Sequence, residues 1–287
     1  MAKSYAHMYG EIIGDFFEES LILYLRPTVE KLGYYLDYRH EREARNGQKE
    51  VRWADSGGNN HKLDIVVEEN GSEKVLGTPR AFIEMAWRRY SKHSKNKVQE
   101  ISGAILPLIE KFKKSAPFYS AVLSGEFTNN ALEQLRSQGF TVCYIDLDKM
   151  EEVFSAFGFN VIWSENTPES FFKDMVVKYQ KLSKEKRYKL YEKFVSVNKV
   201  ELEQFKNALV LSLSRKLERV IIIPTHGLAF PFTTVEDACS FIKGYDENNT
   251  TVPVLYYEVK VVFNTQEEYS CKCKEKAKAI EFLNNYI

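Results

Sequence analysis

Residues 82–90 read FIEMAWRRY, and this stretch constrains the fold more than any other part of the chain. An apolar run of this kind is typical of a buried strand, yet Glu84 stands inside it. An ionised carboxylate in an apolar interior is costly unless it is paired, hydrogen-bonded or bound to a metal ion. We therefore expect Glu84 to lie at a specialised point of a sheet that supplies such a partner.

The order of the surrounding elements predicts an α/β fold. Two strand-like runs, LDIVVE at 63–68 and AFIEMAW at 81–87, are separated by turn-forming residues, which predicts a β-hairpin. Apolar spacing predicts a helix over 9–25 and another over 98–112, and strands are expected at 118–125 and 140–147 with a helix between them. This order favours a mixed β-sheet core flanked by helices.

Prolines and polar residues set the expected limits of these elements. Pro27 is expected to end or restart the first helix, and Pro107 to interrupt or bend the second. The polar residues 41–62 are expected to form loop or short edge structure.

The C-terminal part differs in character. Residues 167–217 have a lysine-rich helical pattern. From Val220 onward a weak repeat aligns 220–245 without gaps on 261–286, and the aligned pairs are Val220 with Val261, Ala238 with Ala279, Phe241 with Phe282, Tyr245 with Tyr286, and Phe230 and Phe232 with Cys271 and Cys273. We predict a small duplicated β-β-α module, with His226 as a turn residue.

Composition narrows the class of protein. The 287 residues include 40 Lys and Arg and 40 Asp and Glu, so local charge must decide whether the chain binds a polyanion. No apolar run approaches the roughly 20 residues that span a bilayer, and acids occupy the first residues where a signal peptide is apolar. We expect a cytoplasmic protein with no membrane partner. The scattered cysteines favour reduced, mostly buried thiols over a zinc site.

Asp64 and Glu84 form the candidate metal site. Asp64 opens the first strand of the predicted hairpin, and strand alternation places Glu84, Ala86 and Arg88 on one face of the second. If the strands pair antiparallel, the two acids can approach each other at one end of the sheet. Two neighbouring carboxylates favour a shared proton or a divalent cation, and oxygen ligands with room for water suit Mg²⁺ or Mn²⁺.

This arrangement resembles the PD-(D/E)XK nucleases, the superfamily of restriction-endonuclease-like folds. The family pattern is an acid at the start of one strand, then a second acid, one spacer residue and a lysine in the next; Asp64, Glu84 and Met85 match its first three positions. Gln99 stands where some members carry a glutamine. The resemblance covers about residues 9–150 and implies a nuclease core over 1–165. A helical connecting region at 166–218 and the duplicated β-β-α module at 219–287, for DNA recognition or dimerisation, would follow.

The chain departs from the family pattern at Ala86, which stands where the lysine is expected. Lys97, Lys62 and Arg88, in that order, are the candidates to supply the missing cation. Migrated catalysis, natural inactivity and an introduced substitution all stay open as explanations of Ala86. Related folds often draw a third acid from the first helix, and Glu11 is the candidate here.

A basic cluster lies next to the predicted metal site. Residues 80–99 contain six Lys or Arg residues and one acid, a composition suited to attracting a polyanion. The predicted nucleic-acid-binding residues are Arg88, Arg89, Tyr90, Lys92, His93, Lys95 and Gln99. Structural interpretations compete with this one: Glu84 paired with Arg80 or Arg88, Asp64 as a turn residue, and the basic run as a solvated surface.

The resemblance implies metal-dependent hydrolysis of phosphodiester bonds in double-stranded DNA, by a restriction or phage-defence enzyme that uses Mg²⁺ or Mn²⁺. Because cutting both strands of a duplex usually takes two active sites, a homodimer is expected. Two other classes stay open. One is a non-catalytic nucleic-acid-binding protein that retains the nuclease fold, and the other is a ligand-sensing defence effector built on the duplicated module.

Overall fold

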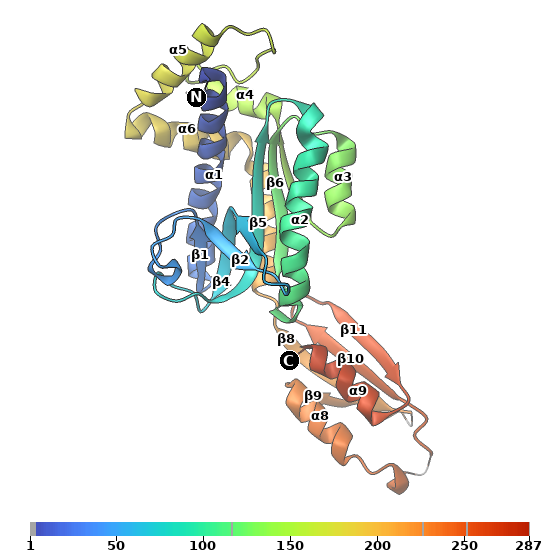
Figure 1. The fold of residues 1–287 in the computed structure, drawn as a ribbon. Helices are drawn as coiled ribbons and strands as arrows, with labels where there is room; N and C mark the ends of the chain where they lie inside the picture. Colours follow the sequence, from blue (N-terminus) through green and yellow to red (C-terminus); the bar gives the residue numbers. More distant parts are fainter. Residues whose placement is uncertain (1–3, 116, 226, 251, 287) are drawn as a thin grey trace. The chain divides into compact units, whose positions relative to one another are not determined.

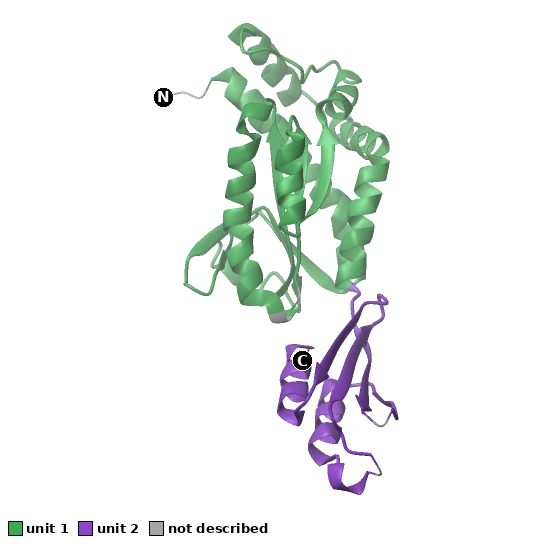
Figure 2. Cartoon of the chain, turned by 90° about the vertical axis from the view of Figure 1, so that its right-hand side faces the viewer, with its two compact units in different colours: residues 1–213 green, residues 214–287 purple. Residues whose placement is uncertain are grey.

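The computed structural model of this protein describes residues 4–115, 117–225, 227–250 and 252–286 (Figure 1). The chain forms two compact units, residues 1–213 and 214–287 (Figure 2). The predicted boundaries at 165 and 218 differ from this division, because the helices after residue 165 belong to the first unit. His226, predicted to be a turn residue, lies outside the described residues.

The first unit is built around a five-stranded mixed sheet with the strand order β1-β4-β5-β6-β7. Its strands are β1 (Tyr34–Tyr38), β4 (Ile65–Glu69), β5 (Thr78–Arg88), β6 (Phe118–Gly125) and β7 (Thr141–Asp146). Strand β4 is antiparallel to both β1 and β5, whereas β5, β6 and β7 run parallel. The predicted α/β class with a mixed sheet is confirmed, and so is the hairpin of β4 and β5.

Helices cover both faces of this sheet (Figure 1). They are α1 (Tyr5–Lys31), α2 (Ser94–Phe112), α3 (Asn129–Ser137), α4 (Leu147–Ser155), α5 (Glu169–Gln180), α6 (Lys184–Val197) and α7 (Lys199–Leu213). Short 3-10 turns occur at η1 (Glu43–Arg45), η2 (Ser91–His93) and η3 (Lys113–Ser115). The polar segment 41–62 contributes a separate hairpin of β2 (Val51–Ala54) and β3 (Asn60–Leu63).

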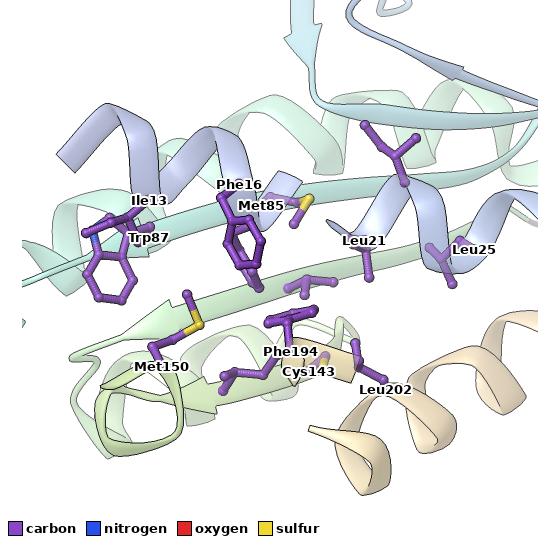
Figure 3. Packing of buried hydrophobic residues seen from close by; sticks show 14 of the residues in the cluster. Ile13, Phe16, Leu21, Leu25, Met85, Trp87, Cys143, Met150, Phe194 and Leu202 are labelled. Atoms are coloured by element: carbon purple, nitrogen blue, oxygen red, sulfur yellow. The ribbon is translucent and has the colours of Figure 1, made fainter. Parts of the chain in front are cut away.

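Alternating residues of β5 pack into the two hydrophobic clusters on opposite faces of the sheet. Met85 and Trp87 lie in the cluster that α1 and α4 to α7 complete, whereas Phe82 and Ala86 lie in the cluster that α2 and α3 complete. Figure 3 shows side chains of α1 on the same side of the sheet as Met85 and Trp87. Glu84 has the parity of Phe82 and Ala86, so its side chain belongs to the face that α2 covers.

Helices α5 to α7 are part of the first core. Phe194 of α6 is fully buried, and its ring lies edge-on against Phe16 and Phe17 of α1 at centroid distances of 5.8 and 6.0 Å. Figure 3 shows Phe194 among residues of α1, α4 and the sheet. The sequence pattern predicts helices here correctly, but apolar packing joins them to the sheet instead of leaving them as a connecting region.

Two helices run through the prolines expected to interrupt them. Pro27 lies inside α1, which ends at Lys31, and Pro107 lies inside α2. Leu25 and Val29, on either side of Pro27, are both fully buried. Their packing keeps the helix continuous, although Pro27 has no N–H group to donate to the preceding turn. Strand β1 is absent from the sequence-based prediction, although its YYLDY sequence contains aromatic strand formers.

The second unit contains the order strand, strand, helix twice. Its elements are β8 (Leu217–Pro224), β9 (Phe230–Phe232), α8 (Val235–Gly244), η4 (Glu247–Asn249), β10 (Tyr257–Phe263), β11 (Glu268–Cys273), α9 (Lys276–Leu283) and η5 (Asn284–Tyr286). The sheet order is β11-β10-β8-β9, so the first strand of each half is central and the second strand is at an edge.

The pairing in this sheet bears on the predicted repeat. Val220 lies directly opposite Val261, the residue with which it aligns, as expected for two halves related by a local two-fold axis. The edge strands differ in register, because Phe232 lies opposite Val220 whereas Tyr269 lies opposite Val261. Tyr269 and not Cys273 is therefore the counterpart of Phe232 by strand pairing. A common origin of the two halves stays a prediction.

Two further sequence expectations can be compared with the fold. Within the described segments, no helix is both long and apolar enough to cross a membrane. All four cysteines are free, and three of them are buried, as the sequence predicts.

Candidate functional site

Asp64 and Glu84 face each other where two strands separate. The last β4–β5 pair at this end joins Ile65 to Ile83, and β5 continues to Arg88 with only β6 beside it. The next pair outward is Asp64 and Glu84, one residue beyond the ladder. We call this point, defined by Asp64 and Glu84, the fork. The structure thus brings together the two acids that the sequence places twenty residues apart.

Main-chain hydrogen bonds fix both carboxylates at the fork. The N–H of Asp64 donates to Glu84 Oε1 at 3.3 Å, and the N–H of Met85 donates to Asp64 Oδ2 at 2.7 Å. In the part of the chain that the structure describes, no donor reaches the other two oxygens, Asp64 Oδ1 and Glu84 Oε2. Each acid therefore keeps one oxygen for a further partner.

The surroundings of the fork make it unfavourable for both carboxylates to be ionised at the same time. Glu84 is 6% exposed, and its pKa is raised to about 8, first by burial and second by the Asp64 charge. Burial also raises the pKa of Asp64, against the opposing effects of the Met85 hydrogen bond and the charge of Lys97. A shared proton or a bound cation would relieve this repulsion.

On α1, Glu18 is an acid that interacts electrostatically with the fork. Its pKa is raised to about 7 by burial and then by the charges of Asp64 and Asp15, while Arg39 acts in the opposite direction. Glu18 also raises the pKa of Glu84, although this is the weakest of the effects on that group. The side chain therefore lies within electrostatic range of the fork.

The predicted third acid, Glu11, lies elsewhere. It is exposed and forms an ion pair with His7 at 3.2 Å, two helical turns before Glu18. The sequence offers one signal for Glu18: it directly follows the buried Phe16 and Phe17, at the border of the apolar stripe. Several acids share the polar side of this helix, so spacing alone did not indicate which of them acts electrostatically on the fork.

Lys97 is the candidate cation that the structure brings to the fork. It lies in the first turn of α2, its side chain is 18% exposed, and its charge lowers the pKa of both Asp64 and Glu84. Ala86, where the family lysine is expected, is buried in the apolar cluster between β5 and α2. The strand position thus carries no charge, whereas a lysine of the neighbouring helix acts electrostatically on both acids.

Each of the three candidate cations also has a contact outside the fork, and for Lys97 this is Glu100 on the same helix at 3.7 Å. Lys62 is exposed and pairs with Glu50 at 2.9 Å, although its charge also lowers the pKa of Asp64. Arg88 donates to the carbonyl oxygen of Trp87 at 2.9 Å. Lys97 is thus the candidate that acts on both acids of the fork.

Glu84 is not held by a structural ion pair with either arginine considered from the sequence. Arg80 instead pairs with Glu69 at 3.4 Å, and Arg88 contacts a main-chain carbonyl. Asp64 does lie between two strands, β3 and β4, yet its side chain is anchored to β5. Neither an ion pair with Arg80 or Arg88 nor a turn role of Asp64 therefore accounts for the way in which the two carboxylates face each other.

The basic run after β5 is partly neutralised. Arg89 pairs with Glu126 at 2.7 Å and donates to the carbonyl oxygen of Trp163 at 2.6 Å, and Lys92 pairs with Glu165. Tyr90 lies against both cations, at 5.0 Å from Arg89 and 5.4 Å from Lys92. The remaining predicted contacts, His93, Lys95 and Gln99, are exposed on η2 and α2.

A groove lies beside Glu18 on the outer side of α1. Its volume is about 480 Å³, and it runs between α1 and the end of β1. The lining side chains are Asp15, Glu18, Glu19, Ile22, Leu23, Arg26, Tyr38 and Arg39. Nothing in the sequence pattern distinguished this groove, because its walls come from two separate elements.

The fork fits a hard divalent cation only if other ligands complete the site. Among residues 4–286 that the structure describes, no three His, Cys, Asp or Glu side chains are grouped closely enough to hold a metal ion by themselves. Mg²⁺ commonly keeps several waters and takes one or two carboxylates together with phosphate oxygens. The two unused oxygens and the repulsion between the acids fit such a site.

The fold and the fork together define an α/β protein with two opposed carboxylates, Glu84 buried and Asp64 half-buried, where the interior strands β4 and β5 of a mixed sheet separate. No protein-family model, curated protein or solved structure matches this chain. Its function must therefore be inferred from its own geometry and chemistry.

Proposed function

We propose that this protein is a Mg²⁺- or Mn²⁺-dependent endonuclease of the PD-(D/E)XK type that cuts double-stranded DNA in restriction or phage defence. The observation that carries the proposal is the opposition of Asp64 and Glu84 at the fork, each with one oxygen left for a ligand. The order of α1, the β4–β5 hairpin, α2 and β6 supports it, because it follows the order that the family resemblance implies.

The residues around the fork have separate tasks in this mechanism. Asp64 and Glu84 would hold the metal ion, which supplies a bound water of lowered pKa and neutralises charge on the scissile phosphate. Lys97 would stabilise the negative charge that develops on the phosphate oxygens. Glu18, with a pKa raised to about 7, is suited to exchange a proton with water near neutral pH.

The decisive experiment is cleavage of supercoiled plasmid DNA with Mg²⁺ or Mn²⁺. We expect the wild-type protein to nick and linearise the plasmid, and Asp64→Asn and Glu84→Gln to lose at least about 100-fold in rate. Glu69→Gln is a matched control, since Glu69 lies at the opposite end of β4 and pairs with Arg80. Unchanged plasmid across several sequences and both metals would exclude the endonuclease.

A non-catalytic DNA-binding protein is the second candidate. The burial of Ala86 in an apolar cluster favours it, because the usual lysine position cannot contribute a charge. This candidate predicts DNA binding by the wild-type protein with no cleavage in either metal. We assign target recognition, dimer formation or both to residues 214–287, and light scattering of the full chain tests whether it is a homodimer.

A further inference from the structure

Arg26 and Arg39 are cations of the groove beside Glu18 for which the structure gives no acidic partner. Arg26 lies over the ring of Tyr38 at 4.8 Å, and no carboxylate of the described residues pairs with it. Arg39 is exposed and acts electrostatically on Glu18, again without forming an ion pair among the described residues. This contrasts with Arg89 and Lys92, whose charges are already met by glutamates.

The groove is polarised along α1. Glu18, which acts on the fork, lies eight residues before Arg26 in a continuous helix, so the two are separated by roughly 12 Å along the helix axis. Buried Ile22 and half-exposed Leu23 lie between them. A strand of a duplex places a phosphate about every 3.4 Å along its axis, so this length corresponds to about three nucleotides.

The acids of the groove do not exclude an anionic ligand. Arg187 opposes the charge of Glu19 and Arg39 that of Glu18, while burial and the like charge of Asp15 raise the pKa of both glutamates and so reduce their negative charge near neutral pH. The acidic end is also the end nearest the fork, where the proposed metal ion would bridge carboxylates and phosphate. Arg26, further along α1, has no such bridge and must meet a phosphate directly.

We propose that this groove carries the DNA strand that flanks the scissile phosphate, with Arg39 and Arg26 as direct phosphate contacts. The proposal rests on the proposed endonuclease function and adds where the substrate lies. Arg39 contacts the backbone next to the fork, and Arg26, oriented by Tyr38, contacts it further along α1. Leu23 presents an apolar surface to the sugars between these contacts. The main DNA track thus follows α1, and not only the basic run after β5.

The test is binding of a fluorescein-labelled random-sequence duplex by the full chain in Ca²⁺, measured by anisotropy at several salt concentrations. The test variant is Arg26→Gln/Arg39→Gln. Its matched control is Arg52→Gln/Arg136→Gln, which removes the same net charge from two exposed arginines that pair with neighbouring glutamates. Thermal melts check that all variants fold, and Arg26→Lys/Arg39→Lys keeps the charge if the glutamines unfold the protein.

Each lost phosphate contact removes about 0.9 from the slope of log affinity against log salt, which weakens binding roughly eightfold at about 0.1 M salt. We expect the slope of the Gln double variant to fall by about 1.8, with the control within about twofold of wild type and the Lys variant retaining most of its affinity. Equal losses in the test and control variants would overturn the proposal, as would an unchanged slope in the Gln double variant.

Calorimetric titration with Mn²⁺ separates this inference from the function on which it rests. The Gln double variant is expected to take up Mn²⁺ as the wild type does. If the wild type takes up Mn²⁺ and cuts DNA while the Gln variant binds DNA normally, only the groove is misassigned. If the wild type takes up no metal or binds no DNA, the endonuclease and the groove both fail.

Discussion

The main-chain N–H of Met85 donates to Asp64 Oδ2 at 2.7 Å, so Asp64 is anchored to the strand that carries Glu84. Because the backbone sets this spacing, the two carboxylates meet in a fixed arrangement before any ligand arrives. Preorganised groups of this kind need little rearrangement when charge develops in a reaction. Because the arrangement is rigid, the repulsion between the two acids is a property of the folded protein. Its effect on the stability of the fold can be measured.

Stability should fall as pH rises through the range in which the fork loses its proton. Glu84 has an ordinary pKa of 4.5 when unfolded and about 8 in the fold, so the folded state binds the extra proton between these values. The stability contributed by that proton is fully present below about pH 4.5 and is lost as pH approaches 8. Glu84→Gln removes the effect.

Calorimetric melting without divalent metal checks this prediction. At pH 5 the wild type and Glu84→Gln should have similar Tm values. At pH 8 the variant should be more stable by about 4 kcal/mol, a difference of roughly 8–16 °C for a unit of this size. The half-buried control Glu69→Gln should not differ from the wild type in this way. Parallel pH profiles for wild type and Glu84→Gln would contradict the burial and repulsion described for the fork.

Lys97→Gln should reduce DNA cleavage by about 100-fold or more without unfolding the protein. The variant should also need a higher pH to take up Mn²⁺, because Lys97 lowers the pKa of both acids at the fork. Calorimetric Mn²⁺ titrations at several pH values measure this shift. Lys113→Gln, an exposed change beyond the C-terminal end of the same helix that removes an ion pair with Glu110, is the control. Retained cleavage would transfer the role to Lys62 or Arg88.

Arg42→Met should destabilise the first unit by about 3–5 kcal/mol. Arg42 is fully buried and pairs with Glu68 at 2.7 Å and with Asp37 at 2.8 Å, and both acids are fully buried too. Removing the guanidinium leaves two carboxylates poorly compensated, although Arg45 still pairs with Asp37.

Urea unfolding followed by tryptophan fluorescence reports on this change, because all three tryptophans lie in residues 1–213. Arg52→Met, which removes an arginine from an exposed pair with Glu50, should stay within about 0.5 kcal/mol of wild type. Similar stabilities for Arg42→Met and Arg52→Met would show that the buried pairs contribute little.

Phe194→Ala should destabilise the same unit by about 3–5 kcal/mol, because the fully buried ring packs against Phe16 and Phe17 of α1. Tryptophan fluorescence in urea again measures the effect, with the exposed Val200→Ala as the control. If residues 166–218 were a separate connecting region, the tryptophan-reported transition would not move. A fragment ending at residue 165 should accordingly fail to fold cooperatively, whereas one ending at 213 should fold.

The sequence predicted those parts of the site that depend on local patterns. Alternation along β5 correctly separated Glu84 from Met85 and Trp87, and the turn between two apolar runs indicated the hairpin that opposes Asp64 to Glu84. The lysine-rich pattern after residue 167 correctly indicated helices. Each of these inferences needs only a few neighbouring residues, because strand and helix periods are properties of a short segment.

Other parts depended on how separate elements dock. The rotation and position of α1 on the sheet decide that Glu18, and not Glu11, acts on the fork. The glutamates that neutralise Arg89 and Lys92 come from residues 126 and 165, far along the chain. The packing of Phe194 against α1 decides where the first unit ends.

The sequence by itself thus determined the pair of acids, the hairpin that carries them and the helical and strand segments around it. Only the tertiary structure decided which acid of α1 and which cations surround that pair, and that a groove with Arg26 and Arg39 adjoins it. The physical reason is the separation along the chain over which each effect acts. Periodicity acts between residues a few positions apart, whereas burial and charge act between side chains that docking brings together from distant segments.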